Sequence, residues 1–216
     1  PGGYTHTFKR RRYEWDVGVH YIGEVMRPSS VLARLFRYVG DGSLEWAEMG
    51  EVYDRIRFGE ETFDFVSGRQ AWTDRMKSYF PDQDDMRAID EYVELVRDAS
   101  RAARGFFSEK ATPKWVSMIA GGQMRKAFMK HASRSTLDVL SGITQNRKLI
   151  AVLTGQYGDY GLPPAQSSFA MHASVVRHYF NGGAYPIGGS ARIFESIYPT
   201  IEAANGLVVT NAEVKQ

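Results

Sequence analysis

The sequence predicts a mixed α/β fold, and three observations indicate it. Aromatic and β-branched residues crowd the first part of the chain, and they favour strands over helices. Residues 51–67 alternate apolar and charged positions around Gly59-Glu60-Glu61, which predicts a half-buried β-hairpin. Most of residues 69–180 instead show apolar positions at helical spacing. A chain of 216 residues can form one large domain or two small ones.

The N-terminal elements follow from local patterns. Residues 4–23 predict strand, turn and strand, with the turn at residues 10–12. Residues 31–39 then carry apolar positions at helical spacing. Ser30 can cap this segment and Gly40 can end it, so we expect a short amphipathic helix.

The central part of the chain is predicted to be helical. Residues 69–79 form a short helix that ends before a proline, and the acidic residues 82–85 suit the start of a longer one. Helical spacing continues almost to Gly155. We expect breaks at Thr112-Pro113 and at Gly121-Gly122.

The C-terminal part predicts two helices and a strand. Residues 167–180 and 190–204 read as helices on either side of a glycine-rich turn at 181–189. Residues 207–214 read as a closing strand. Because the sequence starts at Pro1 without Met and ends within that strand, we expect it to be part of a longer protein.

Composition excludes several classes of protein and site. The balance of 43% hydrophobic and 24% charged residues is that of a globular protein rather than a disordered one. The absence of cysteine excludes disulfides, thiol nucleophiles and cysteine metal sites, and it suits a cytoplasmic location. A net charge of +2 argues against a dedicated nucleic-acid partner. No run of 18 apolar residues predicts a membrane span.

Two glycine pairs suggest close backbone approach to a ligand. Gly2-Gly3 could point amide groups at a phosphate or a ring edge, although a flexible end would have the same composition. Gly188-Gly189 precedes a predicted helix at Ser190, whose free amides would form an anion or dipole site. A plain turn between helices is the alternative for this second pair.

The segment around Gly18 offers polar groups on one side of a predicted strand. Alternation puts Asp16, Gly18 and His20 together, with Val17 pointing away. The glycine again permits close approach of a ligand. The alternatives are that Asp16 caps a turn and that His20 is a hydrogen-bonded core histidine.

Other charged and histidine positions do not predict a site. His172 and His178 are six residues apart and do not share a helical face, so no metal site is predicted, and one of them is expected to bond the backbone. The run from Lys9 to Arg12 falls at a predicted hairpin tip, where such charges are usually solvated.

Four segments together resemble a known enzyme family. They read PGGYT at 1–5, WDVGVHYIG at 15–23, GQYGDYGLPP at 155–164 and GGAYPIGGS at 182–190. In these segments the chain resembles the flavin-dependent oxidoreductases that include retinol saturases, carotenoid isomerases and phytoene desaturases. The family's G-x-G-x-x-G motif, which binds the FAD pyrophosphate, is absent, so the resemblance implies that this motif lies outside the sequence.

The resemblance implies part of a two-domain FAD-binding oxidoreductase, mainly its substrate domain. Residues 1–25 and 181–216 would belong to the FAD domain. Residues 26–180 would form a helix-rich substrate domain that contains the hairpin near 51–67.

The same resemblance implies FAD as cofactor and NAD(P)H as a candidate electron donor. Residues matched to the cofactor are Gly2, Gly3, Thr5, Asp16, Gly18, Gly188, Gly189 and Val214. Candidates for polarising or protonating the substrate are His20, Tyr21 and Tyr185. Val214 would lie with its backbone beside the adenine.

The implied reaction is saturation, desaturation or isomerisation of carbon–carbon double bonds in an apolar polyene, carotenoid, retinoid or other isoprenoid. A basic, aromatic stretch from Lys114 to His131 predicts either a core helix pair or peripheral contact with a membrane. The alternative function is a non-catalytic membrane-surface or lipid-carrier module in which the glycine motifs are only turns.

Overall fold

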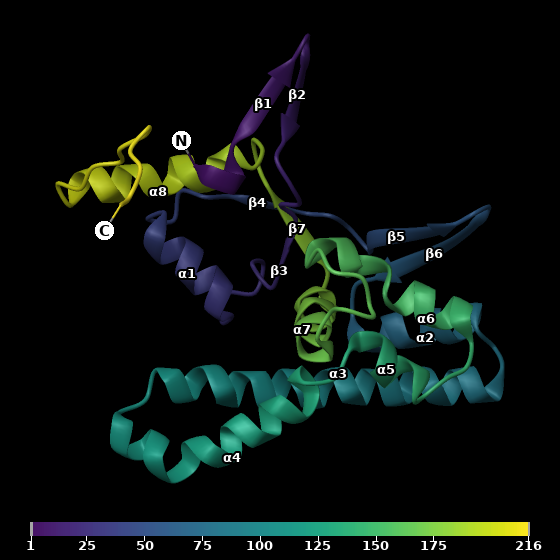
Figure 1. Cartoon of the computed structure of the whole chain (residues 1–216). Helices are drawn as coiled ribbons and strands as arrows, with labels where there is room; N and C mark the ends of the chain where they lie inside the picture. Colours follow the sequence, from purple (N-terminus) through teal and green to yellow (C-terminus); the bar gives the residue numbers. More distant parts are fainter. Residues whose placement is uncertain (1, 216) are drawn as a thin grey trace. The chain divides into compact units, whose positions relative to one another are not determined.

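The computed structural model describes residues 2–215, and the chain forms two compact units. Unit 1 contains the chain up to Glu51 and again from Asn181 onward, and unit 2 is the continuous stretch Val52–Phe180. Figure 1 labels the helices and strands of both units. The domain borders expected from the sequence lie after residues 25 and 180, and the assignment of those segments to FAD and substrate domains stays a prediction.

Unit 1 contains a β-hairpin near the start of the chain. In chain order its elements are the 3₁₀ helix η1 (Gly3–Thr5), β1 (Thr7–Arg10), β2 (Tyr13–Asp16), β3 (Ile22–Gly23), α1 (Val31–Val39), β4 (Trp46–Glu48), β7 (Gly183–Pro186) and α8 (Ala191–Ala203). β1 and β2 pair antiparallel, with Thr7 opposite Asp16 and Arg10 opposite Tyr13. Arg11 has a φ of 57° in the turn between them. The hairpin and the position of its turn confirm the sequence prediction.

A short antiparallel sheet in the order β3-β7-β4 brings the two parts of unit 1 together. Ala184 of β7 lies opposite Ile22 of β3 on one side and Glu48 of β4 on the other. The glycine-rich segment 181–189 therefore contains a strand at Gly183–Pro186, and the prediction of a turn over the whole segment is wrong. Gly183 is needed in this strand because a Cβ atom there would lie 2.9 Å from the ring of Tyr21.

The two helices of unit 1 confirm the predicted segments. The Ser30 side chain caps α1 by accepting a hydrogen bond from the Ala33 amide at 3.0 Å. Gly40 ends α1, and a Cβ atom there would come within 3.0 Å of Ser196 Oγ on α8. Glycine at this position thus lets the end of α1 approach α8 closely.

The predicted strand at 207–214 is wrong. Residues 207–214 form neither strand nor helix, and their apolar side chains are largely exposed, with Val214 at 90%. A strand is stabilised by hydrogen bonds to a neighbouring strand, and within residues 2–215 no strand lies alongside this segment. The β-branched composition alone could not supply that partner.

Unit 2 combines one β-hairpin with helices. Its elements are β5 (Val52–Phe58), β6 (Glu61–Val66), α2 (Arg69–Tyr79), α3 (Gln83–Lys110), α4 (Lys114–Ala132), α5 (Thr136–Ser141), α6 (Arg147–Leu153), the 3₁₀ helix η2 (Gly155–Asp159) and α7 (Phe169–Tyr179). β5 and β6 confirm the predicted hairpin at 51–67, and the helices at 69–79 and 167–180 are confirmed as well.

Trp72 lies at the centre of the unit 2 core. Its side chain is fully buried, and its ring packs edge-on against Phe65 and Phe180, with 5.6 Å between ring centroids in each pair. Tyr92 of α3 lies next to it at 6.0 Å. The core of unit 2 therefore joins the β5-β6 hairpin to α2, α3 and α7.

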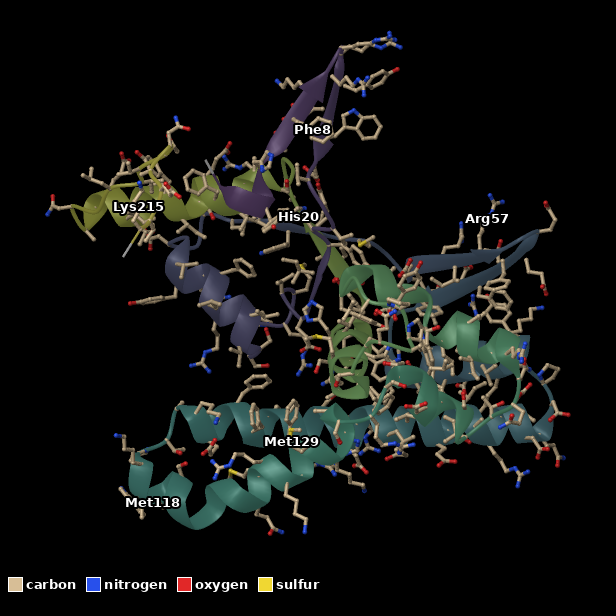
Figure 2. All side chains as sticks on the ribbon, in the orientation of Figure 1. Phe8, His20, Arg57, Met118, Met129 and Lys215 are labelled. Carbon is tan, nitrogen blue, oxygen red and sulfur yellow. The ribbon has the colours of Figure 1, made fainter. Side chains whose placement is uncertain are left out.

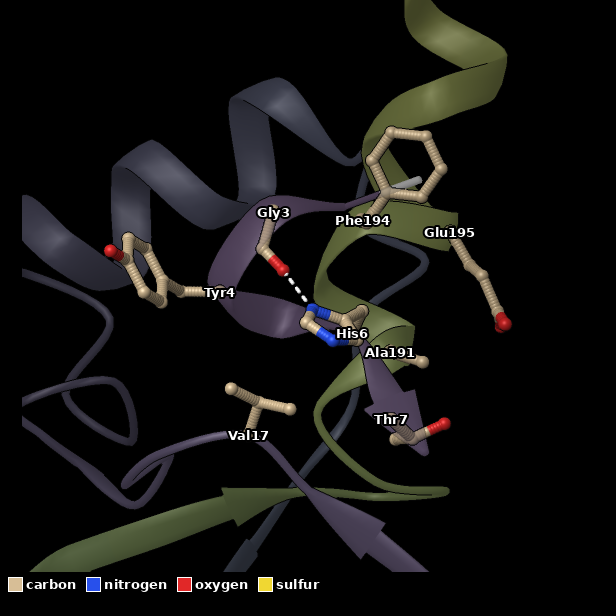
Figure 3. A pocket seen from close by; sticks show the side chains of 8 residues that line it. All are labelled: Gly3, Tyr4, His6, Thr7, Val17, Ala191, Phe194 and Glu195. Atoms are coloured by element: carbon tan, nitrogen blue, oxygen red, sulfur yellow. Dashed lines mark hydrogen bonds between the residues drawn. The ribbon is translucent and has the colours of Figure 1, made fainter. Parts of the chain in front are cut away.

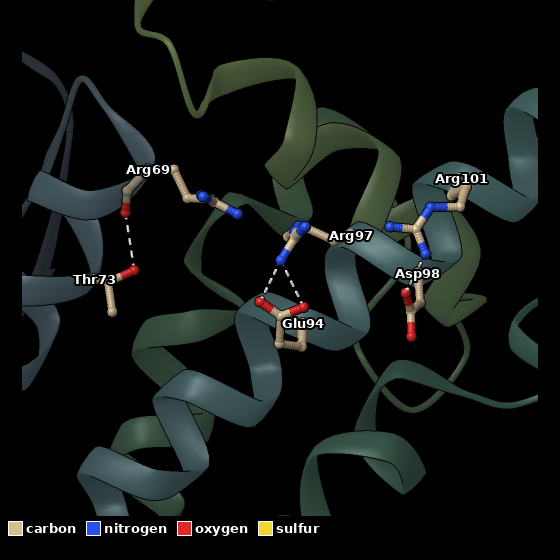
Figure 4. A network of polar contacts seen from close by, with 6 residues as sticks. All are labelled: Arg69, Thr73, Glu94, Arg97, Asp98 and Arg101. Carbon is tan, nitrogen blue, oxygen red and sulfur yellow. Dashed lines mark hydrogen bonds and ion pairs between the residues drawn. The ribbon is translucent and has the colours of Figure 1, made fainter.

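The solvent side of α3 carries paired charges, some of which appear in Figure 4. The Arg97 guanidinium donates to Glu94 at 2.5 and 2.7 Å, and the Arg101 guanidinium donates to Asp98 at 3.0 Å. Such exposed pairs contribute little to stability, but they neutralise this surface.

Helix α4 runs through Gly121-Gly122 without a break, so the break predicted there is wrong, while the one at Thr112-Pro113 is confirmed. A Cβ atom at Gly121 would lie 2.7 Å from the Glu109 carboxylate, so this glycine allows α4 to pack closely on α3. Figure 1 shows α4 folding back along the C-terminal part of α3. Among the described residues, no helix combines the length and apolarity needed to cross a bilayer.

Candidate functional site

A hollow of about 770 Å³ lies in unit 1 beside η1 and the first turn of α8. Its lining residues are Gly3, Tyr4, His6, Thr7, Val17, Ala191, Phe194 and Glu195. Figure 3 shows Tyr4, Val17 and Phe194 around it, with the His6 ring bonded to the Gly3 carbonyl oxygen. The surface of the hollow is largely apolar, with Thr7 and Glu195 as polar groups in its lining.

The predicted glycine pair Gly2-Gly3 borders the hollow. Both residues have positive φ, at 104° and 56°, which glycine adopts without strain. A Cβ atom on Gly2 would lie 3.2 Å from the side chain of Phe194. The Thr5 hydroxyl, expected to donate to a cofactor, donates to the Gly2 carbonyl oxygen at 2.8 Å and holds this turn.

Asp16 binds the start of α8. The Ser190 hydroxyl donates to Asp16 Oδ1 at 2.8 Å, and the Ser190 amide lies 3.4 Å from the same oxygen. This contact joins the end of β2 to the glycine pair that precedes α8. The sequence placed both segments at one site, and the structure brings them together through these two side chains.

The carboxylate of Asp16 changes the chemistry expected at the N-terminus of α8. The sequence predicted free amides there, and therefore an anion or dipole site. The amide and hydroxyl of Ser190 instead face a carboxylate, which would repel a phosphate. Asp16 therefore takes up the Ser190 hydroxyl and amide at the start of α8, and the contact of this turn with a cofactor stays a prediction.

Residues 17–21 do not form the predicted strand. β2 ends at Asp16, and Val17-Gly18 forms a bend in which Gly18 has a φ of 88°. The expected alternation is lost, so Val17 lines the hollow instead of pointing away. A side chain at Gly18 would point toward His20, whose Cε1 atom lies 3.8 Å from the Cβ position.

His20, Tyr21 and Tyr185 are not lining residues of the hollow. The His20 Nδ1 atom is buried and has no hydrogen-bond partner among the described residues. Tyr21 packs its ring on Gly183, and Tyr185 lies in β7 opposite Ala47. All three residues are partly buried in unit 1, and their catalytic roles stay predictions.

The remaining predicted positions divide between the two ends of α8. Gly188 and Gly189 both have positive φ, at 92° and 95°, and the Cβ position of Gly189 lies 3.9 Å from Asp16 Oδ1. Val214 lies in the exposed segment after α8. Its predicted contact with adenine stays a prediction.

A second polar cluster lies in the core of unit 2. The Tyr92 hydroxyl is 2.8 Å from His172 Nε2, and the Tyr160 hydroxyl is 3.0 Å from His172 Nδ1. Burial lowers the pKa of His172 to about 4, so the ring is neutral at neutral pH. A neutral ring carries one proton, so one tyrosine accepts a hydrogen bond from the imidazole and the other donates to it.

In this cluster both ring nitrogens of His172 lie within hydrogen-bonding distance of tyrosine hydroxyls rather than of the backbone. Burial also raises the pKa of Tyr92 well above its usual value. The three side chains therefore satisfy one another's polar groups within the core. Among residues 2–215, no group of three or more histidine, aspartate or glutamate side chains could hold a metal ion.

Sequence reasoning missed most residues that line the hollow. Ala191, Phe194 and Glu195 stand at positions i, i+3 and i+4 of α8, which share one helical face. That spacing was a usable signal. Tyr4 and His6 offered none, because their positions depend on the η1 turn.

Comparisons with known proteins identify relatives along the whole chain. No family model matches. The chain is 35% identical over its whole length to the all-trans-retinol 13,14-reductase of Danio rerio and 32% identical over 99% of its length to that of Homo sapiens. A further Danio rerio relative, 26% identical over the whole chain, is named an inactive all-trans-retinol 13,14-reductase.

The match covers only part of these relatives. The chain spans 36% of the length of each of the three. The aligned region covers both units and so includes the segments that line the hollow. Along its whole length the chain is similar to proteins named all-trans-retinol 13,14-reductase, and this similarity supports its membership of the retinol saturase family.

Proposed function

We propose that the natural protein carrying this chain is an FAD-dependent oxidoreductase that acts on a carbon–carbon double bond of a retinoid or a related apolar isoprenoid. The observation that carries the proposal is the similarity of this chain, along its own length, to part of two proteins named all-trans-retinol 13,14-reductase. The hollow in unit 1 supports it, because its apolar lining suits a ring system or a polyene.

The residues of unit 1 fit the ring portion of FAD better than its pyrophosphate. Tyr4, Val17 and Phe194 offer apolar surface, and the Gly2-Gly3 backbone leaves room for close approach. The Asp16 carboxylate, bound to the Ser190 hydroxyl at the start of α8, disfavours a phosphate group at that point. We therefore expect the phosphate contacts to come from residues other than those at the start of α8.

Reduction of a carbon–carbon double bond adds a hydride to one carbon and a proton to the other. When bound, FAD supplies the hydride chemistry, with NAD(P)H as the candidate source of electrons. The apolar lining of the hollow would hold the substrate and exclude water. His20, Tyr21 and Tyr185 stay our candidates for the proton, although none of them lines the hollow as it stands. Of the three, His20 has a buried Nδ1 atom without a hydrogen-bond partner among residues 2–215.

The test compares one substitution at two places. In the full-length natural protein, Val17→Phe fills the hollow, while Val31→Phe places the same group at an 80% exposed position on α1. We expect Val17→Phe to lower FAD content or retinol turnover at least about tenfold and Val31→Phe to leave both unchanged. Flavin absorbance measures FAD content, and mass spectrometry detects the product with one double bond fewer.

The alternative function is a non-catalytic carrier of apolar lipids. One relative is named an inactive all-trans-retinol 13,14-reductase, and that name supports this alternative. A carrier would bind retinol, as measured by quenching of tryptophan fluorescence, without flavin and without turnover. Retinol binding by a flavin-free protein that stays inactive after addition of FAD and an electron donor would replace the enzyme proposal with the carrier.

A further inference from the structure

A β-bulge directs Tyr53 into the core of unit 2. The pairing of β5 with β6 shifts between Val52 and Asp54, so Tyr53 is an extra residue without a partner in the ladder. A bulge of this kind redirects a side chain, and bulges are common beside functional sites. Figure 2 shows Arg57 near the tip of this hairpin, and Tyr53, four residues earlier in β5, lies nearer its base.

The Tyr53 hydroxyl is buried without a hydrogen-bond partner in the described part of the chain. Tyr53 is 3% exposed, and its ring stacks on Tyr179 and packs edge-on against Phe65. Burial raises the pKa of Tyr53, and the charge of Asp54 adds to this effect, so the hydroxyl keeps its proton and can donate. An unpaired hydroxyl is unfavourable in a protein interior, so a polar partner is expected for it.

Gln156 of η2 leaves a second buried polar atom unpaired beside the same strand. It is 3% exposed, and its amide nitrogen donates to Asp54 Oδ2 at 3.2 Å. A carboxylate can only accept, so the nitrogen must face Asp54 and the Oε1 atom points elsewhere. That oxygen is buried and has no partner among residues 2–215. Asp54 thus connects the two unpaired groups, because it bonds the amide of Gln156 and acts on the Tyr53 hydroxyl through its charge.

Contacts on two sides hold η2 in place. A Cβ atom on Gly155 would lie 2.7 Å from the side chain of Ile56, so glycine at this position lets η2 approach β5 closely. Directly after η2, the Tyr160 hydroxyl lies 3.0 Å from His172 Nδ1 of α7. The amide side chain in η2 is therefore positioned by the fold before any ligand binds.

We propose that Tyr53 and Gln156 bind the hydroxyl group of an apolar alcohol. The oxygen of this hydroxyl accepts a hydrogen bond from Tyr53, and its proton is donated to Gln156 Oε1. A carboxylate cannot donate to Gln156 and is repelled by Asp54, while a hydrocarbon pairs with neither atom. The rings of Tyr179 and Phe65 beside Tyr53 suit the apolar carbons next to the hydroxyl.

The identity of the alcohol rests on the proposed function, because two relatives are named for retinol, a polyene with one hydroxyl group. The chemistry of the site requires only a group that both donates and accepts, and both residues lie wholly in unit 2. A buried water molecule offers the same groups, so the experiment must separate an alcohol from water.

Binding of two probes to the full-length natural protein tests the site. The probes are all-trans-retinol and its methyl ether, which keeps the polyene but cannot donate a hydrogen bond. Quenching of tryptophan fluorescence measures the Kd of each. We expect the ether to bind at least about tenfold more weakly than retinol, because it leaves the Gln156 oxygen unpaired.

Two substitutions should act differently on the two probes. Tyr53→Phe removes the donor that both oxygens accept from, so it should weaken the binding of retinol and of the ether by a similar factor, at least about fivefold. Gln156→Met removes the acceptor that only retinol uses, so it should abolish the preference for retinol over the ether. A preference caused merely by the bulk of the methyl group would persist in Gln156→Met.

Two controls separate ligand binding from stability. Tyr157→Phe removes a hydroxyl from a 48% exposed tyrosine next to Gln156, and it should bind both probes as the wild type does. Tyr53→Phe should raise the melting temperature of the ligand-free protein, because it removes a buried group that lacks a partner. Tyr92→Phe should lower it, because that hydroxyl lies 2.8 Å from His172 Nε2.

Three results would overturn the proposal. They are equal affinity of the wild type for retinol and its ether, a preference for retinol that survives in Gln156→Met, and unchanged retinol binding by Tyr53→Phe together with a lower melting temperature. The last result would assign both atoms to a buried water. Turnover of retinol and its ether at equal rates would remove the hydroxyl site and leave the proposed function standing, whereas a protein that binds neither probe would contradict both.

Discussion

The Ser190 hydroxyl lies 2.8 Å from Asp16 Oδ1 and 3.1 Å from the Thr5 carbonyl oxygen. One buried hydroxyl thus links the start of α8 to the end of β2 and to the η1 turn, although 174 and 185 residues separate these positions in sequence. The three segments border the same hollow, so this link helps to fix its shape.

Removing this hydroxyl should destabilise unit 1. Ser190→Ala leaves the Asp16 carboxylate without its nearest donor, and we expect the free energy of unfolding to fall by about 1–3 kcal/mol. Ser133→Ala is the control, because that serine is exposed and bonds only the Met129 carbonyl within its own helix. Urea denaturation of both variants measures the difference, and equal losses would contradict the role given to Ser190.

Stability should fall with pH as His172 is protonated. Its pKa is about 4 in the folded protein and about 6.5 when unfolded, so the unfolded state binds the proton more readily below pH 6.5. The free energy of unfolding is therefore unaffected by this group above pH 6.5, and it falls by an amount on the order of 3 kcal/mol as the pH falls from about 6.5 to about 4. His172→Phe should flatten this part of the profile, measured by urea denaturation at several pH values. An unchanged slope would show that other groups cause the loss.

The adjacent glycines of α4 should respond in opposite ways to alanine. Gly122→Ala places a Cβ atom in open space and should raise the free energy of unfolding by about 0.5–1 kcal/mol, because alanine favours a helix interior. Gly121→Ala would push against a Glu109 carboxylate that Ser117 and Arg125 hold in place, so it should lower stability. Thermal melting distinguishes the two, and equal gains would refute the close approach of α3 and α4.

Alanine at Gly188 should destabilise the protein through its backbone. The φ of 92° is unfavourable for residues with a Cβ atom, and that atom would also lie 3.0 Å from Arg192 Cγ. We expect a loss of about 1–2 kcal/mol for Gly188→Ala. Gly158→Ala is the control, since Gly158 has no positive φ and its Cβ position is open. Thermal melting of the two variants gives the comparison, and a loss as large in the control would remove the backbone explanation.

Sequence patterns predicted the helices and strands that are determined by residues close to them in sequence. Ser30 caps α1 and Gly59 turns the β5-β6 hairpin, and both signals lie within a few residues of their effect. β4 and β7 were missed because strands of three and four residues have too little periodicity to detect. The failed strand at 207–214 is the converse case, in which composition favours a strand and no neighbouring strand lies beside it.

Only part of the candidate site could be predicted, because some of its contacts join residues that are distant in sequence. Asp16 and Gly189 could be assigned to one site by family resemblance, and the structure places them close together. The partner of Asp16 could not be predicted, since Ser190 reads as an ordinary helix start. The relation between His172 and its two tyrosines was also hidden, because Tyr92 lies 80 residues away from it.

The central strand of unit 1 has a consequence for synthesis on the ribosome. β3 and β4 emerge before residue 52, but β7, which must pair with both, follows only after Phe180. The nascent chain therefore contains all of unit 2 before unit 1 can complete its sheet. Until then the edges of β3 and β4 lack their partner, and this interval exposes the growing polypeptide to mispairing and to chaperones that bind unpaired strands.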